Sequence, residues 1–178
     1  MIVSGQVRIL SEGGEEPSWF AVHTMSRCEA KLEGYLRAIG VEVFLPDYPS
    51  RRQWHDRLKT IRLPLFPGYL FARFRKKLPS AALGAPGFAH IVGFADGPVA
   101  IPEKEIDSVR RMMESGVNVC GCPMFKAGRS VRMRSGPLKG LEGHLEKIKG
   151  QFRLVVSVKL LCRSVTAEVD PEAIEVLQ

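Results

Sequence analysis

Four histidines are the residues of this chain best suited to proton transfer, but their positions do not form a catalytic arrangement. His23, His55, His90 and His144 are scattered, and none belongs to the HExxH pattern of zinc-dependent hydrolases. The sequence also lacks a GxSxG nucleophile motif, a phosphate-binding P-loop and the GxGxxG of dinucleotide-binding domains. It therefore predicts a protein that is not an enzyme and binds no cofactor.

Cysteine is the second residue type that could hold a ligand. Cys120 and Cys122 are separated by one residue, which is not the CxxC spacing of structural zinc sites or of thioredoxin-like redox motifs. We expect these two, together with Cys28 and Cys162, to be free thiols in a reducing cytoplasm. A metal site that Cys120 and Cys122 share with Cys162 or His144 is the alternative.

Positive charge and an aromatic ring coincide in one short polar segment. It contains Arg51, Arg52, Trp54 and Arg57, with Lys59 and Arg62 close behind. Such a segment suits nucleic acid, because cations attract phosphates and aromatic faces stack on unpaired bases. A solvated hairpin tip with Trp54 packed into the core is the alternative interpretation.

Composition limits the class of protein. The chain has 178 residues, is 45% hydrophobic and has a formal net charge of +7. The apolar content is enough for folded cores, and the charge favours nucleic acid, an acidic protein surface or an anionic membrane as partner. No run of 18 apolar residues and no secretory signal is present, so we expect a cytoplasmic protein without a membrane span.

The elements that must position these residues follow from hydrophobic periodicity. We expect a flexible tail over residues 1–17 and an α/β domain over residues 18–115. In that domain Ser26 and Glu29 are spaced as a capping box in front of a helix that ends near Gly40. A second long helix begins after Pro102.

The last third of the chain predicts a different architecture. Residues 116–128 are rich in Gly, Pro and Cys and are interpreted as a linker. Residues 129–178 alternate between apolar and polar positions and predict a small all-β domain. Between its first two strands, Gly136 and Pro137 force a tight turn.

The segment from Val131 to Leu145 resembles a KOW motif, the basic β-hairpin unit of several transcription and ribosomal proteins. Together, the two halves resemble the NusG family of transcription elongation factors. The resemblance covers about residues 18–178. It is carried by several motifs in the family's order: Trp19 to Thr24, Leu65 to Phe71 with its Phe-Pro-Gly-Tyr, Gly87-Phe88, Val92 to Phe94, Pro98 to Pro102, and Val131 to Val158.

The resemblance implies a fold and a set of partners. The fold would be α+β, with an N-terminal α/β sandwich built on a mainly antiparallel sheet and a C-terminal SH3-like β-barrel. The main partner would be the clamp helices of the largest RNA polymerase subunit, contacted through an apolar depression. For that contact we expect four residues: Phe20, His23, Phe66 and Tyr69.

The resemblance also implies contacts beyond the clamp. The helix face with Arg27 and Lys31 would face non-template DNA, and the segment with Arg51, Arg52, Trp54 and Arg57 would add a salt-sensitive contact to DNA or nascent RNA. A mixed solvent face, with Glu29 and Glu33 beside Lys31, is the alternative for the helix.

The barrel would recruit a further partner through Gly136, Pro137 and Leu138, and we expect Leu138 to be exposed at the tip of the turn. The family presents an aromatic residue at that position, and Leu161-Cys162-Arg163 stands where the family often has Phe-Gly-Arg. These departures resemble a specialised, RfaH-like paralogue that antiterminates selected operons. We therefore expect a monomer that retains a small-subunit ribosomal protein as partner and binds Rho weakly or not at all.

Other functions fit parts of the sequence. A KOW protein that binds RNA or the ribosome without polymerase is the first alternative, and the α/β domain with its Phe66 to Tyr69 bend argues against it. A NusG-like factor that promotes pausing or termination is the second. A C-terminal helical hairpin, as in RfaH, is disfavoured by the β-branched run from Leu154 to Val158.

Overall fold

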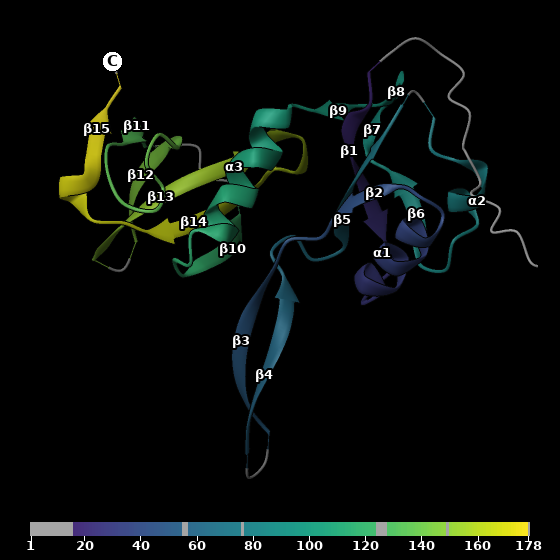
Figure 1. Cartoon of the computed structure of the whole chain (residues 1–178), viewed down its shortest axis with the longest axis horizontal. Coiled ribbons are helices and arrows are strands. Elements are labelled where there is room, and N and C mark those ends of the chain that lie inside the picture. The colour runs from purple at the N-terminus through teal and green to yellow at the C-terminus, as the bar shows by residue number, and fades with distance from the viewer. Residues whose placement is uncertain (1–15, 55–56, 76, 124–127, 149, 178) are drawn as a thin grey trace, which may run out of the picture.

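The computed structural model describes residues 16–54, 57–75, 77–123, 128–148 and 150–177 (Figure 1). Most of the tail expected over residues 1–17 lies outside these ranges. His55 and Asp56 also lie outside them, as do the side chains of Arg51, Arg52 and Trp54.

The first part of the chain is built on an antiparallel sheet with β1 (Ser18–Thr24) at its centre. The sheet order is β2-β5-β1-β6, and β9 pairs with the start of β1. The other strands are β2 (Glu42–Phe44), β5 (Tyr69–Phe74), β6 (Phe88–Ile91) and β9 (Ala100–Ile101). The run from Trp19 to Val22 is buried throughout, as expected of a strand covered on both faces.

Two helices belong to this part, α1 (Glu29–Ala38) and α2 (Ser80–Leu83). Leu32 and Leu36, one turn apart on α1, are fully buried in a core with Val22, Leu70 and Ala82. The expected Ser26–Glu29 capping box is wrong: Cys28 is the N-cap residue and has no capping side-chain hydrogen bond. The Glu29 carboxylate accepts a hydrogen bond from the Gly68 backbone N–H instead, at 2.9 Å.

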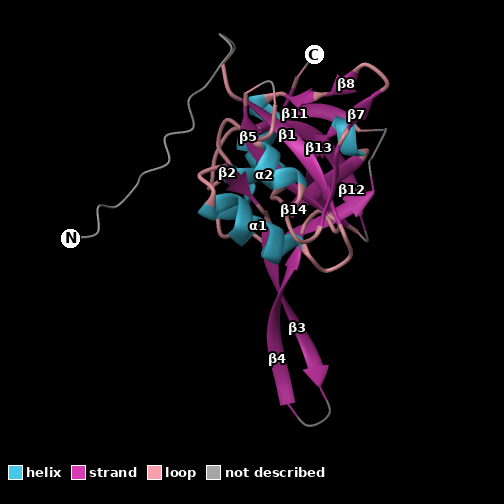
Figure 2. Ribbon diagram, turned by 90° about the vertical axis from the view of Figure 1, so that its right-hand side faces the viewer, coloured by secondary structure: helices cyan, strands magenta, loops and turns pink. Residues whose placement is uncertain are grey.

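A long hairpin interrupts the sheet. Its strands β3 (Asp47–Trp54) and β4 (Arg57–Pro64) pair only with each other and project away from the rest of the molecule (Figures 1 and 2). A much smaller ribbon, β7 (Gly93–Phe94) with β8 (Gly97–Pro98), follows β6.

The bend between β4 and β5 is a tight turn over Phe66-Pro67-Gly68-Tyr69. The Tyr69 N–H donates to the Phe66 carbonyl at 3.0 Å, and Gly68 has a φ of 83°. Pro at the second position and a left-handed Gly at the third are the requirements of a type II turn. The bend expected over Phe66 to Tyr69 is confirmed.

The second part is a six-stranded antiparallel sheet in the order β10-β14-β13-β12-β11-β15, which agrees with the predicted all-β domain. Its elements are β10 (Val119–Pro123), β11 (Arg129–Met133), β12 (Glu142–Ile148), β13 (Gln151–Val158), β14 (Arg163–Glu168) and β15 (Ile174–Val176), with short 3-10 helices η1 (Lys159–Leu161) and η2 (Pro171–Ala173).

The linker expected over residues 116–128 contains an edge strand of this sheet, so that expectation is wrong for β10. The glycine that suggested flexibility is a packing residue. A Cβ atom at Gly121 would overlap the carbonyl oxygen of Leu65, so only glycine lets β10 lie against the first part of the chain.

Helix α3 (Glu103–Glu114) joins the two parts by packing on both β1 and β13. Its Ile106, Val109 and Met112 are fully buried in one hydrophobic cluster that also contains Phe66 and Leu154. Figure 1 shows α3 between the two sheets. The two parts therefore share a core.

Polar contacts reinforce this junction. Lys104 of α3 forms an ion pair with Glu142 of β12 at 2.7 Å, and Arg132 of β11 reaches the same carboxylate at 2.6 Å. Arg111 donates to the Lys139 carbonyl at 2.6 Å. The hydrogen bond from Lys104, followed by that from Arg132, lowers the pKa of Glu142 to about 2.

The ion pairs at Glu142 predict a defined acid sensitivity. Because the folded-state pKa lies below the ordinary carboxyl value, the stabilisation is complete above about pH 4.5 and is lost as the pH falls towards 2. Glu142→Gln should therefore unfold more easily than the wild type at neutral pH, and the difference should shrink to nothing near pH 2. Urea unfolding at a series of pH values measures it.

The control for this prediction is Glu114→Gln, at an exposed carboxylate at the end of α3. We expect its effect on the free energy of unfolding to be small at every pH. A Glu142→Gln difference that persists unchanged at acid pH would show that the ion pairs do not stabilise the junction.

Candidate functional site: a ring row beside a groove

Three rings lie in a row across the central strands of the first sheet. The register of β1 places His23 opposite Tyr69 of β5 on one side and opposite His90 of β6 on the other. The ring centroids of His23 and Tyr69 are 5.0 Å apart in an edge-to-face arrangement, and those of His23 and His90 are 4.9 Å apart and stacked. We call Tyr69, His23 and His90 the ring row.

His23 is the central member of the ring row and is half-buried, whereas His90 is exposed. The Nδ1 atom of His23 is buried and has no hydrogen-bond partner among the described residues. A buried polar atom without a partner costs free energy, and Trp19 Nε1 and Arg153 Nε are in the same condition among the described residues. The ring row thus combines accessible ring surface with unused hydrogen-bonding capacity.

Backbone contacts fix the ring row relative to α1. The Thr24 N–H donates to the Gly68 carbonyl at 2.8 Å, and the Gly68 N–H donates to Glu29 at 2.9 Å. The turn that precedes Tyr69 is therefore tied to both the end of β1 and the start of α1. Arg27, in the connection between them, has a left-handed φ of 58°, which is uncommon for a residue with a side chain.

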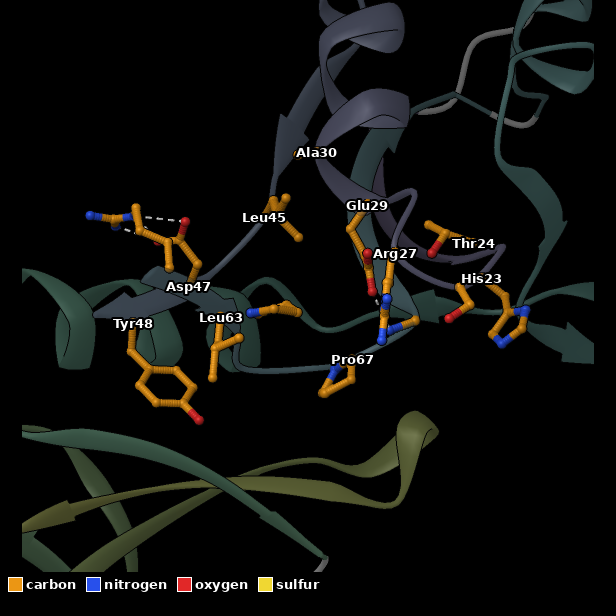
Figure 3. A pocket seen from close by; sticks show the side chains of 14 residues that line it. His23, Thr24, Arg27, Glu29, Ala30, Leu45, Asp47, Tyr48, Leu63 and Pro67 are labelled. Atoms are coloured by element: carbon orange, nitrogen blue, oxygen red, sulfur yellow. Dashed lines mark hydrogen bonds and ion pairs between the residues drawn. The ribbon is translucent and has the colours of Figure 1, made fainter. Parts of the chain in front are cut away.

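A groove of about 1020 Å³ opens beside the ring row, between the start of α1 and the base of the β3–β4 hairpin. Figure 3 shows Arg27 and Glu29 side by side above Pro67, with His23 and Thr24 on one side and Tyr48 and Leu63 on the other. Its lining is mainly apolar, with a few charged groups: His23, Thr24, Ser26, Arg27, Glu29, Ala30, Leu45, Asp47, Tyr48, Arg62, Leu63, Pro64, Pro67 and Gly68.

Several charged side chains of the groove already have partners within the protein. Arg62 donates from Nε to both carboxylate oxygens of Asp47, at 2.9 and 2.8 Å, and Glu29 is held by Gly68. Arg27 has no ion-pair partner among the described residues and is exposed at the rim. The groove therefore offers an apolar floor and one available cation.

The four residues expected to contact polymerase divide into two pairs. His23 and Tyr69 lie in the ring row and remain accessible. Phe20 and Phe66 are core residues, 8% and 0% exposed, so the structure corrects their expected place at the surface. Phe66 packs edge-to-face on Phe71 at 5.3 Å, and Phe20 stacks on Phe74 at 4.3 Å, because the neighbouring strands bring these rings together.

The residues expected to contact nucleic acid fall in two places. Arg27, in the connection before α1, and Lys31, in the first turn of α1, are both exposed. Arg51, Arg52 and Trp54 belong to β3 and Arg57 to β4, away from the α1 pair. Of these four candidate residues in the hairpin, the structure describes the side chain of Arg57 only, and it is exposed. The groove connects α1 to the base of the hairpin.

The turn expected to bind a barrel partner is partly hidden. Gly136 and Pro137 are exposed, but Leu138 is only 2% exposed and belongs to the core cluster that contains Met112 of α3. The expectation of an exposed Leu138 is therefore wrong. A leucine between two turns cannot be buried by local contacts, and its burial depends on the packing of α3 nearby, which no local pattern indicates.

Most residues of the groove, and one member of the ring row, are not among the site residues expected from the sequence. They include His90, Tyr48 and Leu63. The pairing of β6 with β1 was the missing information, since register rather than local sequence brings His90 next to His23. Alternating positions in the hairpin could have pointed to Tyr48 and Leu63, which face each other across β3 and β4.

The described ranges show little sign of a metal site or of a redox-active thiol. They contain no group of three or more His, Cys, Asp or Glu residues placed to hold a metal ion. Cys28, Cys120, Cys122 and Cys162 are all free thiols. Burial raises the pKa of the Cys122 thiol, which disfavours a reactive thiolate there. No helix in the described ranges is long and apolar enough to cross a membrane.

The fold and the site define a class: an α/β domain with a row of three rings beside a groove, joined to a small all-β domain. Comparison with known proteins identifies the family. The family model described as "Transcription termination factor nusG" matches residues 17–110. The chain belongs to the NusG family.

Relatives span nearly the whole chain. The transcription termination/antitermination protein NusG of Pseudomonas aeruginosa is 26% identical over 174 residues, covering 88% of this chain and 97% of that protein. The Staphylococcus aureus NusG is 26% identical over 186 residues, covering 94% and 100%. The protein is therefore a transcription termination or antitermination factor of a family without enzymatic activity.

A solved structure shows the same fold. The chain in "Domain interaction in Thermotoga maritima NusG" aligns with a TM-score of 0.53 at 22% identity, over 93% of this chain and all of that one. This confirms the predicted α+β fold with an antiparallel N-terminal sheet and a C-terminal all-β domain.

The burial of Leu138 yields a prediction about stability. Leu138→Ala should lower the free energy of unfolding by ~2–5 kcal/mol, because it removes buried methyl groups and leaves a cavity. Lys139→Ala, at the neighbouring exposed position, should change it by no more than ~0.5 kcal/mol. Urea unfolding of both variants is the measurement. If the two variants were equally stable, Leu138 would not belong to the core.

Proposed function

We propose that this protein binds RNA polymerase through the ring row and the adjoining groove, and that it modulates elongation as an operon-specific antiterminator. The observation that carries the proposal is the ring row itself. An edge-to-face and stacked set of rings, partly exposed beside an apolar groove and held by three paired strands, is a preorganised contact for a protein partner.

The groove suits a helical segment of polymerase, such as the clamp helices of its largest subunit. Its apolar floor of Leu45, Leu63 and Pro67 would receive the apolar face of a helix. His23 and Tyr69 would then be direct contacts, with His90 as an added member. Phe20 and Phe66 would support them from the core rather than touch the partner.

The exposed cations extend the same surface towards nucleic acid. Arg27 and Lys31 lie at the start of α1, where the groove begins, and the basic hairpin leaves from its other end. We propose that these residues contact DNA, or nascent RNA, beside the polymerase site. The net charge of +7 favours such a contact.

The barrel would contribute a separate partner site. With Leu138 buried, a partner at the Gly136-Pro137 turn meets little apolar surface. We propose that the barrel retains contact with a small-subunit ribosomal protein and binds Rho weakly or not at all. Loss of Rho contact is what an antiterminator requires.

The polymerase contact predicts unequal effects of mutation. Tyr69→Ala and His23→Ala should each weaken binding to the native RNA polymerase by roughly tenfold or more, because truncating a central anchor typically costs about 2 kcal/mol. Titration of labelled protein with core polymerase measures the affinity. Leu83→Ala, exposed on α2, is the matched control and should bind as the wild type does.

Phe66→Ala tests whether Phe66 stabilises the fold and does not itself touch the polymerase. Since Phe66 is buried, this variant should lose ~3–5 kcal/mol of stability. Wild-type affinity of folded Tyr69→Ala and His23→Ala would contradict the polymerase site, whatever Phe66→Ala does.

The antitermination proposal is tested by transcription in vitro with the native polymerase, with and without Rho. We expect longer transcripts past terminators when the protein is present, including in reactions with Rho. Increased termination or prolonged pausing would instead identify the protein as a factor that promotes release.

A further inference from the structure

We infer that the β3–β4 hairpin is a ribbon that enters the major groove of double-stranded DNA. This inference rests on the proposed function for its biological setting and narrows the nucleic-acid partner to one class. The hairpin is a two-stranded ribbon, because β3 and β4 pair over eight residues each and with no other described strand. At about 3.3 Å per residue, the ribbon extends roughly 26 Å.

The ribbon is exposed along its outer half. Every described side chain from Arg57 to Thr60 is exposed, and Leu58, at 71%, is among the most exposed large apolar residues of the protein. Figures 1 and 2 show from two directions that the ribbon projects freely from the body. The outer half of the ribbon is therefore an exposed arm, and only its base lines the groove.

The charged residues of the arm are almost all positive. Between Tyr48 and Leu63 the sequence has several Arg and Lys residues, with Asp56 as its one acidic residue. The register pairs Arg52 with Lys59 and Trp54 with Arg57. Since side chains alternate across a strand, Arg57 and Lys59 belong to one face of the ribbon. Their positive charge suits the phosphates that flank a groove.

The opposite face holds the pairs Arg51–Thr60 and Gln53–Leu58, so it adds an amide and an apolar position to a further basic one. Gln53 pairs with Leu58 across the ribbon, and both are exposed. An amide side chain matches the hydrogen-bonding edge of adenine, and an apolar side chain matches the methyl group of thymine. Both groups are displayed in the major groove.

The shape of the ribbon favours duplex DNA over double-stranded RNA and over single strands. The B-DNA major groove is about 12 Å wide and admits a two-stranded β-ribbon, whereas the A-form RNA major groove is too deep and narrow for side chains to enter. Proteins that bind single strands usually follow the backbone along a charged groove, and a projecting ribbon offers none. Duplex DNA is the partner that this arm fits.

The test uses the full-length protein without polymerase. Fluorescence anisotropy would compare a 20-base-pair DNA duplex, its separate strands and the RNA duplex of the same sequence at low salt. We expect the DNA duplex to bind more tightly than either competitor. Methyl green, which occupies the major groove, should displace the protein, whereas netropsin, which occupies the minor groove, should not.

Two charge-reversal variants test whether the hairpin is the surface that binds the DNA duplex. Arg57→Glu should weaken duplex binding and reduce the slope of log affinity against log salt by about 1. Arg129→Glu, at an exposed position of the second sheet, changes the net charge equally and should have a much smaller effect. Circular dichroism confirms that both variants are folded.

Equal or tighter binding to single strands or to RNA would overturn the inference, and so would equal effects of the two reversals. The outcome is independent of the polymerase site. Arg57→Glu should bind core polymerase without nucleic acid as the wild type does, so failure of the ring row and failure of the hairpin are seen in different assays.

Discussion

The antiparallel pairing of β1 with β5 on one side and β6 on the other is the constraint on which the site depends. One register places Tyr69, His23 and His90 side by side, and a slip by one residue would turn His23 to the other face of the sheet. The same strand ends at Thr24, where its hydrogen bond to Gly68 ties it to the turn before Tyr69. Ring row, turn and the start of α1 therefore form one rigid unit, which lowers the entropic cost of binding a partner.

Helix α3 extends this rigidity to the rest of the chain. Its buried residues complete a core that both sheets share, and its polar residues pair with the second sheet. The β3–β4 hairpin is excluded from this core and projects from it. The protein thus combines a fixed surface of rings beside a groove with an exposed basic arm, an arrangement suited to contacting polymerase and nucleic acid together.

Local patterns predicted most of the elements, because their signals are local. Pro67 and Gly68 specify the bend, and the apolar spacing after Pro102 specifies α3. What could not be predicted depends on contacts between distant segments. Gly121 suggested a linker because its close approach to Leu65 is invisible in sequence, and Leu138 was expected at the surface for the same reason. Of the site, His23 and Tyr69 came from a family motif, whereas strand pairing supplied His90.

Hydrogen–deuterium exchange of the full-length protein, free and bound to its native RNA polymerase, tests the central claim most directly. It reports protection along the backbone without altering any residue. The account predicts that binding slows exchange in residues 23–30 and 62–69, which line the groove, while the outer strands of the second sheet stay unchanged. Protection confined to the second sheet, with no change around the ring row and groove, would contradict it.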